Sequence, residues 1–169
     1  MESIMNISLG GFLDKLENEF GLINKIRPVL SKPGGKNLKY QINDNFLNFW
    51  FRFIYKYRSA VEIENFDYVK TIIQRDYQTY SGFILERYFR EKLKIEKNFS
   101  VIGSYWESGN QNEIDIVALN EYEKTALIAE VKRNNKNINL NVLREKSVNL
   151  VKHLAGYKIE YQGFSMLDM

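Results

Sequence analysis

The spacing of apolar residues near the N-terminus predicts a helix followed by a hairpin. Between residues 8 and 20, apolar side chains recur every three or four positions, which is the period of an amphipathic helix. Ser8 is placed to cap this helix and Gly21 to end it. Short apolar runs at 22–26 and 39–42 predict two strands, and the Pro- and Gly-containing segment between them predicts a turn.

A helix, a strand, a basic turn and a returning strand make up the second half of a winged helix, whose recognition helix enters the major groove of DNA. Only about seven residues precede Ser8, too few for the first two helices of that fold, so residues 1–43 predict a partial winged helix. The net charge is +3, and most of the positive excess lies in the first 58 residues, which is compatible with contact to phosphates. The lysines of the hairpin either contact phosphates or face solvent; they are Lys32, Lys36 and Lys39.

Residues 44–80 predict a helical connector that is rich in aromatic side chains. Asp44 is placed to cap a helix over 44–58, and apolar residues lie on nearly all sides of that helix, so we expect it to be buried. A longer helical pattern covers residues 66–94, with a break expected near Ser81 and Gly82.

From about residue 99 the apolar period changes to two, which predicts strands. Three strands are expected at 100–106, 113–119 and 125–132, the last two joined by a polar turn. An amphipathic helix over 142–154 and a possible strand from residue 157 follow. Residues 81–169 therefore predict an α/β core of helix, three strands, helix and a possible strand.

Composition excludes several classes of protein. The chain has 169 residues, of which 44% are hydrophobic and 14% aromatic, enough for one domain or two small ones around a core. No apolar run is long enough to cross a membrane, and no secretion signal is apparent, which favours the cytoplasm. Cys is absent and His153 is the one His, so a thiol nucleophile and a Cys/His metal site are excluded. A P-loop motif is absent, so the chain alone is not expected to be a P-loop ATPase.

Carboxylates interrupt two of the predicted strands. Strand alternation places Glu113 and Asp115 on one face of the second strand and Glu130 and Lys132 on one face of the third, and a short hairpin brings Asp115 toward Glu130. Two carboxylates that repel one another need positive charge, which either Lys132 or a divalent cation supplies. Mg²⁺ and Mn²⁺ prefer oxygen ligands and can polarise a phosphoryl oxygen. The alternative is a cross-strand charge cluster on a solvated sheet face.

Asp115 followed by Glu130-Val131-Lys132 resembles the pattern of the PD-(D/E)XK nuclease superfamily, with Ile114 in place of the superfamily's Pro. The flanking sequence resembles the nuclease-like C-terminal region of archaeal-type AAA+ ATPases over nearly the whole chain, from about residue 8 to about residue 154. The segments that carry this resemblance, in the same order as in that family, are DNFLNFWFRF at 44–53, GFILE at 82–86, IGSYW at 102–106 and NEIDIVA at 112–118.

This resemblance implies a restriction-endonuclease-like core at 81–169, preceded by the partial winged helix and the connector. It also implies a DNA phosphodiesterase that depends on Mg²⁺ or Mn²⁺. Asp115 and Glu130 would be metal ligands, Lys132 the catalytic cation, and Glu86, on the preceding helix, a further ligand. The other interpretation of Glu86 is an exposed helix residue paired with Arg90.

Members of the family carry an ATPase module that this chain lacks. The chain therefore resembles the C-terminal part of a longer protein or a shortened paralogue, and a separate ATPase partner is expected. The alternative function is a non-catalytic DNA- or protein-binding regulatory module. A fragment without activity is a third hypothesis. A homodimer is expected to cover the apolar residues that half a winged helix leaves open, which are Leu9, Leu13 and Leu16. Trp106 is expected to pack in a core or interface rather than to stack on a base. Lys146 is expected at the surface, the alternative being the accessory polar group that the superfamily often has on this helix, and His153 is expected on a helix surface.

Overall fold

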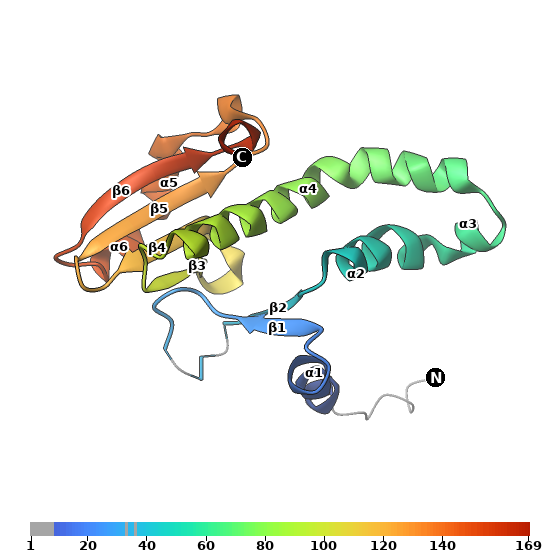
Figure 1. Ribbon diagram of the computed structural model, residues 1–169, viewed down its shortest axis with the longest axis horizontal. Helices are drawn as coiled ribbons and strands as arrows, with labels where there is room; N and C mark the ends of the chain where they lie inside the picture. The colour runs from blue at the N-terminus through green and yellow to red at the C-terminus, as the bar shows by residue number, and fades with distance from the viewer. Residues whose placement is uncertain (1–8, 33, 36) are drawn as a thin grey trace. The chain divides into compact units, whose positions relative to one another are not determined.

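The computed structural model is a mixed α/β chain that describes residues 9–32, 34–35 and 37–169 (Figure 1). Its contacts divide the chain into two units. The first comprises the residues up to Ile26 together with Leu38–Ile72, and the second comprises Arg27–Asn37 together with Ile73–Met169. The domain boundaries that the sequence predicts, after residues 43 and 80, stay a prediction.

The first unit begins with the predicted helix and hairpin. Helix α1 is Leu9–Asn18, and the strands are β1 (Ile23–Ile26) and β2 (Lys39–Ile42). The strands pair antiparallel, with Ile23 opposite Ile42. Gly21 has a φ of 60°, the left-handed conformation in which glycine commonly follows a helix. The predicted cap at Ser8 and the hairpin residue Lys36 lie outside the described residues.

The aromatic segment that follows is not buried, so the expectation of a helix enclosed on all sides is wrong. Asp44 caps α2 (Asn45–Phe49), with Oδ1 accepting a 2.7 Å hydrogen bond from the N–H of Leu47. A π-helical stretch (Trp50–Ile54), a 3₁₀ turn (Tyr55–Tyr57) and α3 (Arg58–Glu62) complete it. Phe53 is fully buried, but four aromatic rings are exposed: Phe46, Trp50, Phe51 and Tyr55. These four pair along the helix surface, Phe46 with Trp50 and Phe51 with Tyr55. Each ring thus packs against its neighbour on the same helical segment instead of entering a core.

Helix α4 (Phe66–Glu96) is continuous, so the break expected at Ser81 and Gly82 is also wrong. The Ser81 hydroxyl donates a 2.8 Å hydrogen bond to the carbonyl oxygen of Tyr77 one turn earlier, which satisfies it within the helix. Nothing lies within 4 Å of a Cβ built on Gly82, so this glycine marks no close contact. No helix among the described residues is long and apolar enough to cross a membrane.

The second unit is built on a four-stranded mixed sheet in the order β3-β4-β5-β6. The first three strands run antiparallel and β6 pairs parallel with β5. The strands expected from the sequence are all present, including the possible last one. Their bounds are β3 Val101–Tyr105, β4 Ile114–Asn120, β5 Thr125–Val131 and β6 Lys158–Phe164. The helix expected at 142–154 forms as two pieces, α5 (Leu140–Lys146) and α6 (Val148–Lys152), which meet at the buried Ser147.

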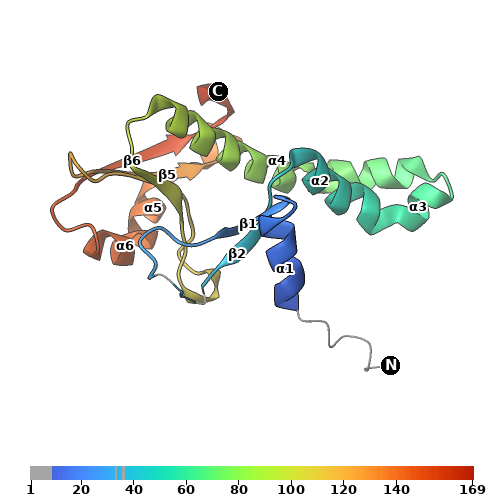
Figure 2. The same ribbon diagram turned by 60° about the horizontal axis from the view of Figure 1, so that its bottom comes forward.

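Helices cover both faces of this sheet (Figures 1 and 2). The second part of α4 packs Leu85, Phe89 and Leu93 on one face, and α5 and α6 pack Leu143 and Leu150 on the other. The two central strands, β4 and β5, are consequently buried on both sides and read as nearly continuous apolar runs. Polar side chains in these strands are confined to their ends.

The described residues of the loop between β1 and β2 belong to the second unit, and hydrogen bonds join them to β3 and to the residue that follows it. The N–H of Val29 donates to the carbonyl oxygen of Ser104 at 2.9 Å. The indole Nε1 of Trp106 donates to Oδ1 of Asn37 at 2.8 Å. Trp106 is 2% exposed, which confirms the packing role expected for it.

Candidate active site

The pairing of β4 with β5 brings Asp115 and Glu130 together at one end of the sheet. Ile116 lies opposite Ala129 and Val117 opposite Ile128, so the next pair outward in this antiparallel register is Asp115 with Glu130. The hairpin turn that joins the strands lies at their other end. The close approach of the two carboxylates therefore follows from the short hairpin and the alternation of side chains.

Asp115 is held in place by the neighbouring strand. Its Oδ2 accepts a 2.8 Å hydrogen bond from the backbone N–H of Val131, and its side chain is 16% exposed. Burial raises the pKa of Asp115, while the Val131 hydrogen bond and the charge of Lys132 act against that rise. The carboxylate is thus fixed in a poorly solvated position where negative charge is costly.

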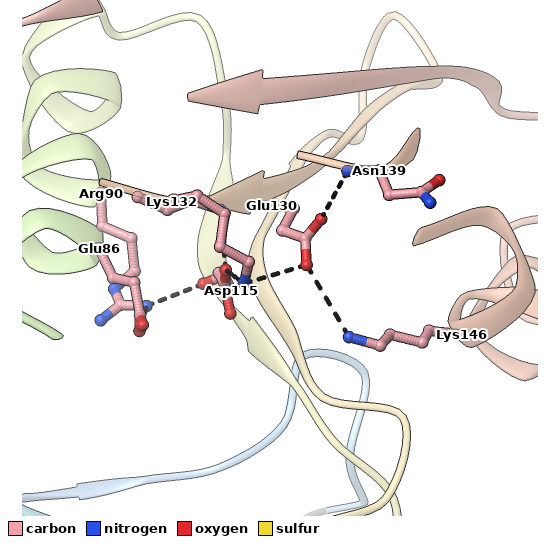
Figure 3. Close-up of polar contacts among 8 residues, drawn as sticks. Glu86, Arg90, Asp115, Glu130, Lys132, Asn139 and Lys146 are labelled. Atoms are coloured by element: carbon pink, nitrogen blue, oxygen red, sulfur yellow. Dashed lines mark hydrogen bonds and ion pairs between the residues drawn. The ribbon is translucent and has the colours of Figure 1, made fainter. Parts of the chain in front are cut away.

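Glu130 is surrounded by groups that donate hydrogen bonds or carry positive charge (Figure 3). Its Oε1 lies 3.0 Å from the Nζ of Lys132 and 3.9 Å from the Nζ of Lys146. Its Oε2 accepts a hydrogen bond of 3.3 Å from the backbone N–H of Asn139. Lys146 is therefore near the cluster, although the sequence favoured a plain surface lysine. Glu130 itself is 7% exposed.

Lys132 bridges the two carboxylates. Besides its 3.0 Å contact with Glu130, its Nζ lies 3.9 Å from Oδ2 of Asp115. Burial lowers the pKa of Lys132, but the charges of Asp115 and Glu130 outweigh burial, and the net pKa is raised. The ammonium group is therefore held in its charged form between the two acids.

Helix α4 contributes Glu86 and Arg90 to the same end of the sheet. Arg90 Nη1 donates a 2.8 Å hydrogen bond to the backbone carbonyl oxygen of Asp115 and lies 3.8 Å from Oε2 of Glu86. The pairing of Glu86 with Arg90 is present, but Glu86 is only 29% exposed, so the interpretation as an exposed helix residue is wrong. Burial, followed by the charge of Asp115, raises the pKa of Glu86 to about 7.

The sequence pattern does not indicate two of the contacts at this site, those of Arg90 and Asn139. The spacing of four residues between Glu86 and Arg90 predicts that they pair, but nothing in that spacing indicates that Arg90 bonds to a backbone carbonyl on another element. Asn139 binds Glu130 through its main chain, so its side-chain identity carries no signal of the contact. Glu113 is exposed.

The donor chemistry of this cluster suits a hard divalent cation. Asp115 and Glu130 offer carboxylate oxygens, the ligand type that Mg²⁺ and Mn²⁺ prefer, and Mg²⁺ usually keeps several waters in protein sites. In the part of the chain that the structure describes, no group of three or more His, Cys, Asp or Glu side chains is arranged to hold a metal ion. An ion at this place would thus be held by two carboxylates, with water completing its coordination.

A cavity of about 750 Å³ lies elsewhere on the second unit, between the C-terminal part of α4 and β6. Its lining includes Phe89, Lys97, Glu160 and Phe164, and it includes none of Asp115, Glu130 or Lys132. The pair of Asp115 and Glu130 is therefore not part of this cavity.

Comparison with known proteins places this chain within a family. Residues 50–148 match the family DUF234, described as archaeal and bacterial proteins of unknown function, and this match spans more than half of the chain. An uncharacterized protein of Methanocaldococcus jannaschii is 38% identical over 124 residues, covering 69% of this chain and 27% of that relative. The chain thus matches about a quarter of the length of that relative. No solved structure matches the chain. The chain belongs to the DUF234 family.

Proposed function

We propose that the second unit is a PD-(D/E)XK-type DNA phosphodiesterase that depends on Mg²⁺ or Mn²⁺. The observation that carries the proposal is the convergence of Asp115, Glu130 and Lys132, in which one ammonium lies 3.0 Å and 3.9 Å from the two carboxylates. The order of elements supports a restriction-endonuclease-like core, because α4 is followed by three strands, two short helices and a further strand.

The roles follow from the contacts. Asp115 and Glu130 would hold the cation, and a bound Mg²⁺ or Mn²⁺ supplies polarisation of a phosphoryl oxygen and a more acidic water. Lys132 keeps its charge because two acids flank it, and it can stabilise the negative charge that develops on the phosphate. Arg90 fixes the start of β4 by its bond to the Asp115 carbonyl oxygen, and so sets the position of that carboxylate. Glu86 lies beside Asp115 and would assist with the cation.

DNA is the substrate that this proposal names, since the net charge is +3 and the first unit has a helix followed by a two-stranded hairpin, the elements expected for a partial winged helix. We include a separate ATPase partner in the proposal. The chain resembles the C-terminal region of archaeal-type AAA+ ATPases, and in those proteins an ATPase module accompanies this region. A cytoplasmic location is compatible with a DNA substrate and with an ATPase partner.

One observation favours a second function, a non-catalytic DNA- or protein-binding regulatory module. Lys132 and Lys146 both lie within 4 Å of Glu130 and compensate its charge without any metal. A cluster that is already compensated can serve as a fixed ionic network that stabilises the sheet end. The two functions differ in whether divalent cations bind at Asp115 and Glu130.

The direct test is cleavage of supercoiled and linear DNA in the presence of Mg²⁺ or Mn²⁺. We expect the wild-type protein to cleave, and the Asp115→Ala and Lys132→Ala variants to lose activity by about 100-fold or more. Glu145→Ala and Lys152→Ala are matched controls on α5 and α6, and they should retain activity. The enzyme proposal is wrong if the wild type cleaves no faster than the Asp115→Ala/Lys132→Ala double variant.

Calorimetric titration with Mn²⁺ separates the two functions. Heat of binding that disappears in Asp115→Ala supports the metal site. Salt-sensitive DNA binding without any Mn²⁺ binding would favour the regulatory module.

A further inference from the structure

Arg133 follows Lys132 directly, two residues beyond the end of β5, and its guanidinium lies over the ring of Tyr77. Its Nε is buried and has no hydrogen-bond partner within the described ranges. The guanidinium carbon lies 5.6 Å from the centre of the Tyr77 ring, in a cation–π contact. No ion pair within 4 Å joins Arg133 to a carboxylate among the described residues, and the contact with Tyr77 holds the guanidinium in place.

Tyr77 presents much of its ring to solvent. It lies on α4 and is 47% exposed. The ring of Tyr80, one turn further along the helix, is centred 6.5 Å away at an interplanar angle of 41°. Tyr77, Tyr80 and Arg133 therefore form a surface of two rings and one cation, which we call the tyrosine platform.

The platform lies close to the candidate active site along two elements. On β5 and its extension, Arg133 is the residue after Lys132. On α4, Tyr77 precedes Glu86 by nine residues, which is about 13 Å along the helix axis. A nucleic-acid strand advances by about 3.4 Å per nucleotide in duplex form, so one strand can reach both places within a few nucleotides.

We propose that the tyrosine platform binds an unpaired nucleotide of the DNA substrate, with the base stacked on Tyr77 and a phosphate bonded to Arg133. This inference rests on the proposed function and names its substrate class as DNA with a single-stranded segment. A base inside a duplex is already stacked between its neighbours, whereas an unpaired base has a free face for an exposed ring. A guanidinium can bind phosphate through the parallel N–H donors of its two terminal nitrogens, which leaves the buried Nε of Arg133 out of the contact, and it retains this ability while it lies over an aromatic ring.

Binding measurements test the platform independently of cleavage. The affinities of the full chain for a labelled single-stranded oligothymidylate and for a blunt duplex of equal length are measured by fluorescence anisotropy, with EDTA present. We expect Tyr77→Leu to weaken single-strand binding about 10-fold and to change duplex binding less than about 2-fold. Arg133→Gln should weaken single-strand binding and lower its salt dependence by about one phosphate contact.

Two controls separate stacking from general damage. Tyr77→Phe keeps the ring and should keep single-strand affinity, and Tyr122→Leu alters a tyrosine that is 95% exposed in the β4–β5 turn. Thermal unfolding of each variant checks that the fold is retained. The platform proposal is overturned if the wild type does not bind the single strand. It is also overturned if Tyr77→Leu weakens binding no more than Tyr122→Leu does, or weakens single strand and duplex equally. Absence of cleavage with this binding pattern intact would instead remove only the phosphodiesterase proposal.

Discussion

The backbone N–H of Val131 donates a 2.8 Å hydrogen bond to Oδ2 of Asp115. This bond joins the first residues of β4 to the last residue of β5, just beyond the point where Ile116 pairs with Ala129. The side chain of Asp115 thereby continues the strand ladder and is fixed at the same time. The same carboxylate therefore contributes a hydrogen bond to the fold and is a proposed metal ligand.

Replacement of Asp115 separates its hydrogen bond from its charge. In Asp115→Asn the amide oxygen can still accept from Val131, whereas in Asp115→Ala the N–H of Val131 loses its acceptor. We expect Asp115→Ala to be less stable than Asp115→Asn by roughly 1–3 kcal/mol, measured by urea unfolding in EDTA. Equal stability of the two variants would show that the hydrogen bond contributes nothing to folding. Both variants should lack the proposed activity, because neither offers a carboxylate to a cation.

Glu86 predicts a dependence of stability on pH. Its pKa of about 7 in the folded chain lies above the ordinary value of 4.5, so the folded state binds more protons than the unfolded state between these pH values. Stability contributed by this group therefore falls as pH rises from about 4.5 to about 7, and the loss is complete above that range. Glu86→Gln cannot ionise, so its stability relative to wild type should improve from pH 5 to pH 8 by roughly 1–3 kcal/mol.

The measurement is urea unfolding of wild type and Glu86→Gln across this pH range, with EDTA present so that no cation compensates the acids. Glu91→Gln is the matched control, because Glu91 is on the same helix with a side chain that is 65% exposed. If the stabilities of wild type and Glu86→Gln run parallel from pH 5 to pH 8, the raised pKa is refuted.

The central pairing of the candidate site was predictable because it depends on local rules. Asp115 and Glu130 lie in strands whose side chains alternate between the two faces of the sheet, and a short polar turn joins those strands. A single register fits both the alternation and the turn length, and it pairs Asp115 with Glu130. Their convergence with Lys132 follows from the side-chain period of two. No packing between distant elements has to be known.

Features that depend on distant packing were not predictable. The contact of Arg90 with the Asp115 carbonyl oxygen involves a backbone acceptor, which every residue possesses and no sequence pattern marks. The nearness of Lys146 to Glu130 depends on how the connection from β5 to β6 folds back. Along α2 and the π-helical stretch, the sequence shows which side chains are apolar but not which neighbour covers them. The exposure of Phe46 and Trp50 could therefore not be predicted from it.

Gly163 in β6 is predicted to be intolerant of any side chain. A Cβ at this position would overlap Cγ2 of Ile138 and lie 2.8 Å from its Cδ1. We expect Gly163→Ala to lower the free energy of unfolding by roughly 1–3 kcal/mol through this steric overlap. In an Ile138→Ala background the same substitution should cost less, because the overlapping atoms are gone.

Gly82→Ala provides a control of opposite sign. Nothing lies within 4 Å of a Cβ at residue 82, which is inside α4, so alanine there should stabilise the chain by roughly 0.5–1 kcal/mol. Urea unfolding of the wild type and the three variants in the Gly163 and Ile138 cycle gives the coupling energy. An additive cycle would mean that Ile138 is not the cause of the intolerance.

The bond between Trp106 and Asn37 predicts how the loop that ends at Asn37 is held to the rest of the second unit. Trp106 is 2% exposed and its indole N–H has Asn37 Oδ1 as acceptor at 2.8 Å. In Asn37→Ala this buried donor loses that acceptor, which should cost roughly 1–3 kcal/mol of stability. In a Trp106→Phe background no N–H needs an acceptor, so Asn37→Ala should then cost much less. Asn141→Ala, at an exposed position of α5, serves as the control in urea unfolding. Equal costs of Asn37→Ala in both backgrounds would show that the loop is held by its other contacts, such as that of Val29 with Ser104, rather than by this bond.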